Sequence, residues 1–190
     1  MNQSDTSKIV INGKNVRLRR KSIVDARDDY RWQTDPELAE LDATTPPDLS
    51  FSQYLSEYTF ELSFPSSVRR EFAVETLDGT HIGNCVYYDI KWDKKEAELG
   101  IIIGDRNYWD TGYGVDVVTT LLTHIFSQTN LQRIYLKTLD RNTRAQKCFE
   151  KCGFTPYGSV VRDGYSFILM ELSRRQWQES QAKIARVFKE

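Results

Sequence analysis

The sequence is poor in the residues that build metal and redox centres. Among its 190 residues there are three cysteines, Cys85, Cys148 and Cys152, and two histidines, His81 and His124. An odd number of cysteines behind a polar N-terminus predicts reduced thiols rather than disulfides. The histidines do not cluster with the cysteines along the chain, so no zinc site is indicated. We therefore expect no metal, and we interpret the cysteines as small buried side chains.

The sequence also lacks a strong charge of either sign and any long apolar run. Its formal net charge is −1 at pH 7, with 28% charged and 39% hydrophobic residues. This balance argues against binding to bulk nucleic acid, and no run approaches the ~20 apolar residues of a membrane span. The polar start MNQSDTSKIV has no apolar signal core. We therefore expect a single cytoplasmic domain over residues 1–190, without membrane contact.

Apolar periodicity and turn residues predict a mixed α/β chain. Alternating or β-rich segments predict strands at 15–20, 72–76, 81–90, 97–103, 133–138, 156–161 and 165–172. Helices are predicted at 25–32, from residue 36, over 50–62, over 115–126 and from 142 to 152. Asp25 is a candidate cap of the first helix, and Ser50 with Gln53 matches a capping box. We expect disorder over residues 1–8 and a polar helical tail over 173–190.

The most informative segment is the loop over residues 107–114, which reads NYWDTGYG. It joins the apolar strand LGIIIG to the amphipathic helix that begins VDVVTTLL. Gly112 and Gly114 let the backbone approach a ligand and adopt positive φ. The start of the helix presents free N–H groups there, which predicts an anion site, most often for phosphate. Because the loop contains no Lys or Arg, we expect backbone amides to make most of the contacts.

The glycine pair by itself is also compatible with an ordinary tight turn. It is not a P-loop, which ends in Gly-Lys-Ser/Thr. It also departs from the dinucleotide fingerprint, because Val117 stands where a third glycine is needed. A generic nucleotide-binding α/β protein therefore stays open as one interpretation.

Four segments in order resemble motifs of the GNAT superfamily of acyl-CoA-dependent N-acetyltransferases. AELGIIIG resembles the family's fourth strand, WDTGYG its pyrophosphate loop, RNTRAQKCFEKCGF its second coenzyme motif and FILMEL its closing strand. The resemblance covers about residues 14–177. It implies the GNAT fold, which is a mixed, mostly antiparallel sheet of about seven strands that splays between strands 4 and 5, with about four flanking helices. Trp109, where the family consensus has Gln or Arg, is similar to the branch of ribosomal-protein N-terminal acetyltransferases.

The resemblance implies an N-acetyltransferase that uses acetyl-CoA as acyl donor. An acceptor primary amine, on a protein N-terminus or on a small molecule, would attack the thioester directly. The alternative is a GNAT-fold acyl-CoA-binding sensor with little or no turnover. The implied partners are acetyl-CoA and an amine acceptor, with no nucleic acid, and the implied assembly is a monomer or a homodimer.

The resemblance also assigns coenzyme contacts. Amides of the glycine loop would bind the pyrophosphate, strand main chain would pair with the pantetheine arm, and Asn142 would hydrogen-bond that arm. The full set is Ile101, Ile102, Ile103, Trp109, Asp110, Thr111, Gly112, Tyr113, Gly114, Asn142, Ala145 and Phe149. Asn142 can also cap its helix. Asp110 carries a charge that repels a diphosphate, so we expect it to face solvent or to cap the following helix.

The catalytic expectation rests on the same resemblance. A lysine-like amine, with a pKa of ~10.4, must lose a proton before it attacks a thioester. Family members often use a fourth-strand glutamate as base. Glu96 and Glu98 share one side of the strand, and Glu98 matches the family position better, with a solvent-facing carboxylate as the alternative. The usual tyrosine acid is replaced by Phe149, which has no hydroxyl. Candidate substitutes are Tyr113, Tyr157 and Tyr165.

Acceptor specificity is expected from loops carried by the scaffold. The candidates are the segments 42–48 and 63–70, together with Trp32. Trp32 also has the simpler interpretation of a core residue. The sequence does not rank these residues.

Overall fold

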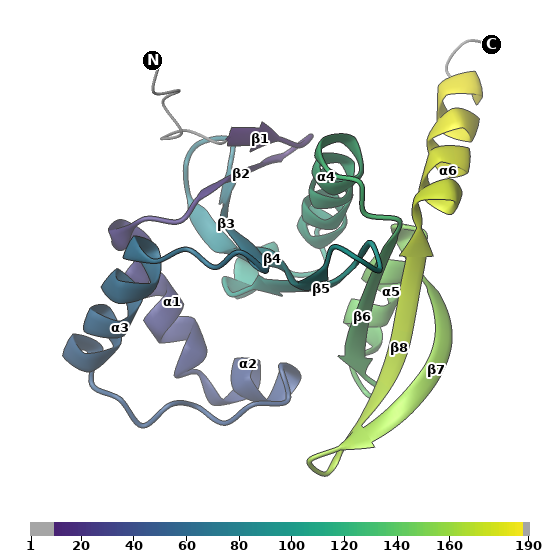
Figure 1. Ribbon diagram of the computed structural model, residues 1–190. Coiled ribbons are helices and arrows are strands. Elements are labelled where there is room, and N and C mark those ends of the chain that lie inside the picture. The colour runs from purple at the N-terminus through teal and green to yellow at the C-terminus, as the bar shows by residue number, and fades with distance from the viewer. Residues whose placement is uncertain (1–9, 188–190) are drawn as a thin grey trace.

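The computed structural model describes residues 10–187 of the chain (Figure 1). The predicted disorder at residues 1–8 and the last three residues of the predicted tail lie outside the described residues. In chain order the elements are β1 (Val10–Asn12), β2 (Val16–Arg20), the short 3₁₀ helix η1 (Ile23–Asp25), α1 (Ala26–Gln33), α2 (Pro36–Leu41), α3 (Phe51–Ser63), β3 (Arg69–Thr76), β4 (His81–Lys91), β5 (Glu96–Ile103), η2 (Arg106–Tyr108), α4 (Tyr113–Gln128), β6 (Arg133–Leu139), α5 (Thr143–Lys151), β7 (Thr155–Arg162), β8 (Tyr165–Ser173) and α6 (Arg174–Val187).

The strands of residues 10–187 form one mixed sheet in the order β1-β2-β3-β4-β5-β6-β8-β7. Every neighbouring pair is antiparallel except β5 and β6, which run parallel. The sequence predicted about seven strands. The additional one is β1, which has three residues and is too short to show a period of two. The part of the chain that is described also has six α-helices rather than about four.

The predicted splay lies between β5 and β6, the fourth and fifth of the strands expected from the sequence. These strands pair only from Glu96 to Glu98, opposite Arg133 to Tyr135. Both strands continue past that point, to Ile103 and Leu139, without pairing to each other. The sheet therefore opens into a fork whose vertex lies at Glu98.

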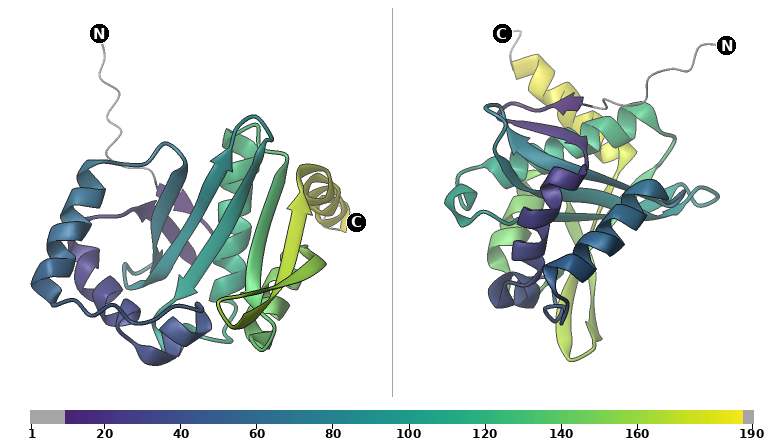
Figure 2. Two further views of the ribbon diagram at one scale, coloured as in Figure 1. Left: turned by 60° about the horizontal axis from the view of Figure 1, so that its bottom comes forward. Right: turned by 90° about the vertical axis from the view of Figure 1, so that its left-hand side faces the viewer.

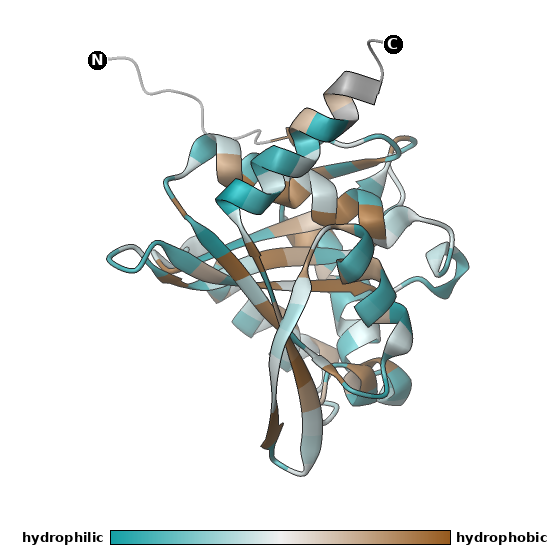
Figure 3. Ribbon diagram, turned by 90° about the vertical axis from the view of Figure 1, so that its right-hand side faces the viewer, coloured by the Kyte–Doolittle hydropathy of each residue, from teal (hydrophilic) through white to brown (hydrophobic). Residues whose placement is uncertain are grey.

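The helices lie on both faces of the sheet (Figures 1 and 2). α4 packs on the strands through buried residues that include Val118, Leu121 and Ile125, and these join the main hydrophobic core. α1 and α3 form a smaller cluster around Tyr54 and Tyr58 near the other face. In Figure 3 the central strands are largely brown, whereas α6 and the turns are largely teal. None of the described helices is both long and apolar enough to cross a bilayer.

Local signals explain several helix ends. Ser50 and Gln53 form the predicted capping box at the start of α3, and the Asp35 carboxylate accepts hydrogen bonds from the first turn of α2. The prediction that Asp25 caps α1 is wrong, because its side chain makes no cap hydrogen bond. The Asp25 carboxylate instead binds the Arg19 guanidinium of β2 at 2.6 and 2.8 Å. Leaving a buried carboxylate without a partner costs more free energy than leaving the end of a helix without a side-chain cap.

Candidate active site

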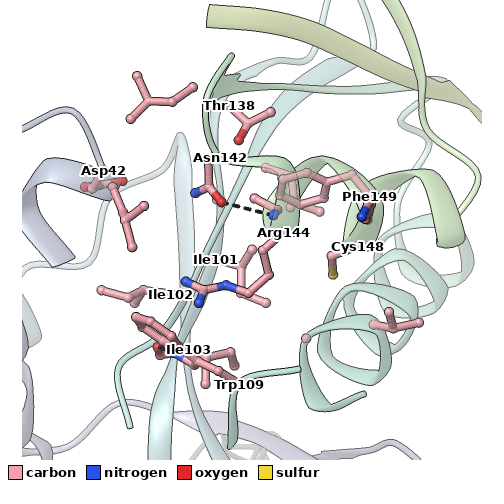
Figure 4. Close-up of a pocket in the computed structure, with 18 of the residues that line it drawn as sticks. Asp42, Ile101, Ile102, Ile103, Trp109, Thr138, Asn142, Arg144, Cys148 and Phe149 are labelled. Carbon is pink, nitrogen blue, oxygen red and sulfur yellow. Dashed lines mark hydrogen bonds between the residues drawn. The ribbon is translucent and has the colours of Figure 1, made fainter. Parts of the chain in front are cut away.

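A cavity of about 350 Å³ passes through the fork between β5 and β6. One half is lined by α4 and α5, through residues such as Val115 and Phe149. The other half is lined by α2 and by side chains on the opposite face of the sheet, including Leu38 and Glu98. Figure 4 shows the fork, with α5 on one side and Asp42 on the other. Two ligands that approach from opposite faces can therefore meet at the vertex.

The backbone of β5 presents unpaired polar groups to this cavity. The Gly104 N–H donates to the Ile82 carbonyl. This bond shows which residues of β5 turn their main-chain polar groups toward β4 in the antiparallel pairing. By the alternation of such ladders, Ile102 turns its N–H and C=O toward β4, whereas Ile101 and Ile103 turn theirs into the fork. All three isoleucines line the cavity. Only Ile101 and Ile103, however, have main-chain groups that an added strand-like ligand can reach.

The Ile103 carbonyl already has a partner, because Trp109 Nε1 donates to it at 2.6 Å. The Trp109 ring is in turn covered by two guanidinium groups. Arg144 of α5 lies 3.5 Å from the ring centroid, and Arg106 lies 5.4 Å from it. Arg106 is itself held by Asp35 at the start of α2. Trp109 thus connects the glycine loop to both β5 and α5 (Figure 4).

The glycine loop has the backbone geometry that its sequence predicted. Gly112 is the N-cap of α4 and has φ +90°, a conformation that L side chains rarely adopt. A Cβ built on Gly112 would have no neighbour within 4 Å, so the backbone there is open to a ligand. The α4 helix begins at Tyr113, two residues earlier than predicted, and Gly112 at its N-cap lines the cavity.

The other loop residues differ in position. Gly114 and Asp110 line the cavity, whereas Thr111 and Tyr113 do not. The Thr111 hydroxyl donates to the Tyr108 carbonyl at 2.7 Å, and the Tyr113 ring packs edge-on against that of Tyr108. Asp110 is exposed and does not cap α4. Of the two alternatives given for its side chain, the structure therefore has the one that faces solvent.

The glycine loop contains no Lys or Arg, but α5 contributes three cationic side chains to the cavity. Arg144, Lys147 and Lys151 line the cavity, and their spacing of three and four residues places them on one stripe of the helix. The cavity therefore offers cationic side chains to an anion in addition to the expected backbone amides. The i, i+3, i+7 spacing was visible in the sequence. That the stripe faces the glycine loop depends on how α5 packs beside α4.

The structure also brings the other α5 candidates to this cavity. Asn142, Ala145 and Phe149 all line the cavity. Asn142 Oδ1 accepts from the Ala145 N–H at 3.1 Å, the bond dashed in Figure 4, so Asn142 is the N-cap of α5. Phe149 is buried and packs edge-on against Phe154. Cys148 and Cys152 are only half-buried, and Cys148 lines the cavity, contrary to the interpretation of buried cysteines.

Glu98 lies at the vertex and lines the cavity with a side chain that is 12% exposed. Its Oε1 accepts from the Tyr88 hydroxyl at 2.6 Å and from Lys137 Nζ at 2.7 Å. Burial, followed by this hydrogen bond to Glu98, raises the pKa of Tyr88. Glu96 lies outside the cavity and pairs with Arg133 at 2.9 Å. The two glutamates share a face of β5, but of the two only Glu98 lines the cavity.

Few of the remaining residues proposed from the sequence line the cavity. Tyr113, Tyr157 and Tyr165, the candidate acids, do not line the cavity, and neither does the segment 63–70. Trp32 is buried and packs against His81 and Gly104, as its core interpretation predicted. From the segment 42–48 only Asp42 lines the cavity. Among residues 10–187, no three His, Cys, Asp or Glu side chains are grouped so as to hold a metal ion.

Comparisons with known proteins agree with this geometry. The chain is 28% identical over 147 residues to an uncharacterised N-acetyltransferase p20 of Bacillus licheniformis, covering 77% of this chain and 82% of that one. It is 29% identical over 97 residues to a spermidine N(1)-acetyltransferase of Vibrio cholerae, covering 51% and 56% of the two chains.

The fold is shared with solved structures. The crystal structure of a Vibrio cholerae spermidine N-acetyltransferase in complex with CoA and spermine superposes with a TM-score of 0.78 at 22% identity, covering 86% of this chain and 98% of that one. The family model of the acetyltransferase (GNAT) domain matches residues 15–155. The chain therefore belongs to the GNAT acetyltransferases, acyltransferases that take the acetyl group from acetyl-CoA.

Proposed function

We propose that this chain, acting as a single domain, transfers the acetyl group of acetyl-CoA to a primary amine at the vertex of the β5–β6 fork. The observation that carries the proposal is the cavity in the fork between β5 and β6, which is lined by Glu98 at the last position of β5 that pairs with β6. A coenzyme on the α4–α5 side and an amine on the α2 side would meet beside this carboxylate.

The chain offers suitable groups for each part of the coenzyme. The pantetheine arm would pair with the free main-chain groups of Ile101 and with the N–H of Ile103. The pyrophosphate would lie on the loop from Trp109 to Gly114, where the helix start and the open backbone of Gly112 favour an anion. The cationic stripe of α5, formed by Arg144, Lys147 and Lys151, would neutralise the phosphates.

Glu98 is the proposed base. Bound acetyl-CoA supplies an acyl group activated as a thioester. Glu98 would take a proton from the amine, because an ammonium has no lone pair with which to attack. Among the described residues, Oε2 of Glu98 accepts no hydrogen bond, so this oxygen is available for the amine.

We propose a small cationic amine as acceptor, with a polyamine as the first compound to test. Support comes from the spermidine N(1)-acetyltransferase relative and from two carboxylates, Asp42 and Glu98, in the acceptor half of the cavity. The second acceptor class is a protein N-terminus. It is supported by Trp109, because a tryptophan at this position is similar to the branch of ribosomal-protein N-terminal acetyltransferases.

Two measurements test the proposal. Calorimetry should detect CoA binding, and CoA at 100 times its dissociation constant should stabilise the fold by about 2.7 kcal/mol. Release of free thiol should then be measured with acetyl-CoA and polyamines, amino acids, aminoglycosides or peptides that start with Ala or Ser. No CoA binding at millimolar concentration would reject the proposal. Binding without turnover on any acceptor would favour the sensor, for which Phe149 in the usual acid position is the supporting observation.

A further inference from the structure

The vertex of the fork contains a second ionisable side chain that the proposed base chemistry does not use. Lys137 lies on β6, two residues beyond Tyr135, the last β6 residue that pairs with β5. Its Nζ donates to Glu98 Oε1 at 2.7 Å, so this ion pair bridges the two strands just where they separate. Both side chains line the cavity. Lys137 therefore lines the cavity at the vertex, beside Glu98.

Acetyl transfer requires a proton at the leaving sulfur as well as a base at the amine. An N–C bond forms, the C–S bond breaks, and one proton moves from nitrogen to sulfur. Phe149 has no proton to give, and the three tyrosines considered as substitutes do not line the cavity. The donor must therefore be sought among the polar side chains that do.

Most of these side chains lie elsewhere or are already engaged. Asn142 caps α5. Cys148 lies beside Gly114 at the glycine loop, where a Cβ built on that glycine would be 3.3 Å from its Sγ. Tyr108 packs edge-on against Tyr113. None of the three contacts Glu98.

Two side chains that line the cavity donate hydrogen bonds to Glu98 at the vertex, and these are Tyr88 and Lys137. The Tyr88 proton is held in its hydrogen bond to Glu98, and burial makes its loss harder still. Lys137 carries three donor hydrogens on a flexible stem, of which the bond to Glu98 uses one. A cation also attracts the negative charge that develops on sulfur.

We propose that Lys137 gives a proton from Nζ to the sulfur that leaves, and that Glu98 then returns a proton to Nζ. Glu98 receives the amine proton at Oε2, and rotation of the carboxyl group about its Cγ–Cδ bond brings this proton to the neutral Lys137 amine, which takes it up. The proton lost by nitrogen is thus balanced by the proton gained by sulfur, and both side chains return to their starting charge. This inference rests on the proposed function, because it takes Glu98 as the base.

The test is the ionisation of the thiol of bound CoA, which does not require an acceptor. The ultraviolet absorbance of the thiolate is followed against pH for the CoA complex, with desulfo-CoA as the blank. If Lys137 lies beside the sulfur, the pKa of the bound thiol should be about 1–3 units higher in Lys137→Gln than in the parent, because a nearby cation favours the thiolate. Lys91→Gln, the same change at a cation outside the cavity, should leave it unchanged.

A second variant separates charge from proton donation. Lys137→Arg keeps the cation and should preserve the lowered thiol pKa, yet it should lose turnover at least tenfold because a guanidinium does not release its proton. The Lys137 side chain is 36% exposed, so these variants should fold. An unchanged thiol pKa in CoA-bound Lys137→Gln would overturn the inference. Absence of CoA binding to the parent protein would instead reject the proposed function.

Discussion

Replacing Trp109 tests how the glycine loop is held in place. Trp109→Phe keeps an aromatic ring between Arg144 and Arg106 but removes the N–H that donates to the Ile103 carbonyl. One net hydrogen bond is worth about 0.5–1.5 kcal/mol. A chain of this size loses about 2–4 °C in Tm per kcal/mol. We therefore expect the Tm to fall by about 1–6 °C.

Trp109→Ala removes the ring as well. Each cation–π contact at a half-exposed site contributes about 0.5–1 kcal/mol, so the total loss with the hydrogen bond is about 1.5–3.5 kcal/mol. Arg144 also loses the surface that orients it toward the cavity. Because one phosphate-binding cation would then be mobile, we expect CoA affinity to fall about tenfold, which corresponds to ~1.4 kcal/mol.

The assays are thermal unfolding without ligand and calorimetry with CoA. The matched controls are Trp92→Phe and Trp92→Ala, which change an exposed tryptophan in the turn between β4 and β5. These should shift the Tm by less than about 1 °C, as surface substitutions usually do. CoA affinity that is the same in Trp109→Ala as in the parent would refute the role assigned to this ring.

Three further predictions concern the base, the loop and the ion pair at Asp25. Glu98→Gln should lower turnover by about 10²–10⁴ in a thiol-release assay, with CoA affinity unchanged. The control, Glu96→Gln, should have a much smaller effect. Equal rates for Glu98→Gln and the parent at pH 7 would remove Glu98 from the mechanism. Gly112→Val should abolish CoA binding in calorimetry, because the branched side chain would occupy the open space where the pyrophosphate would approach and would disfavour the φ of +90°. Circular dichroism should stay native, because a Cβ at this position meets no other atom within 4 Å. Tight binding by this variant would contradict the loop assignment. Burial is the largest single influence on Asp25 and opposes its ionisation, but the hydrogen bonds from Arg19 and from the Ser22 N–H, together with nearby positive charge, outweigh burial and lower the Asp25 pKa. The stabilisation from ionised Asp25 is therefore complete above about pH 4 and is lost as pH falls through the lowered pKa. Urea unfolding at pH 7 and pH 3 should therefore show a smaller pH dependence in Asp25→Asn, and an equal dependence would exclude this pair as a cause.

Much of the fold was predictable because its signals are local. The capping box of Ser50 and Gln53, the Asn142 cap and the positive φ of Gly112 each depend on a few adjacent residues, and the structure has all three. β1 was missed because three residues show no periodicity, and their strand forms only by pairing with β2. Asp25 was misassigned because its partner, Arg19, lies on another element.

In the candidate site, too, features carried by adjacent residues were predictable, whereas contacts between distant segments were not. The resemblance identified the glycine loop, the α5 motif and Glu98, since these are contiguous patterns in the chain. It could not show that Ile102 turns its main chain away from the fork, because that follows from the phase of the β4–β5 ladder. Nor could it show that Arg144 stacks on Trp109, since the two residues come from separate elements.

The sequence by itself determined the capped starts of α3 and α5, the position of the positive φ at Gly112, and which family the motifs resemble. These are decided by residues close together in the chain, whose sterics and hydrogen bonds do not need the rest of the fold. The tertiary structure alone decided that Lys137 pairs with Glu98 at the vertex and that the α5 cations face the glycine loop. Contacts between distant segments depend on register and helix packing, which no short stretch of sequence specifies.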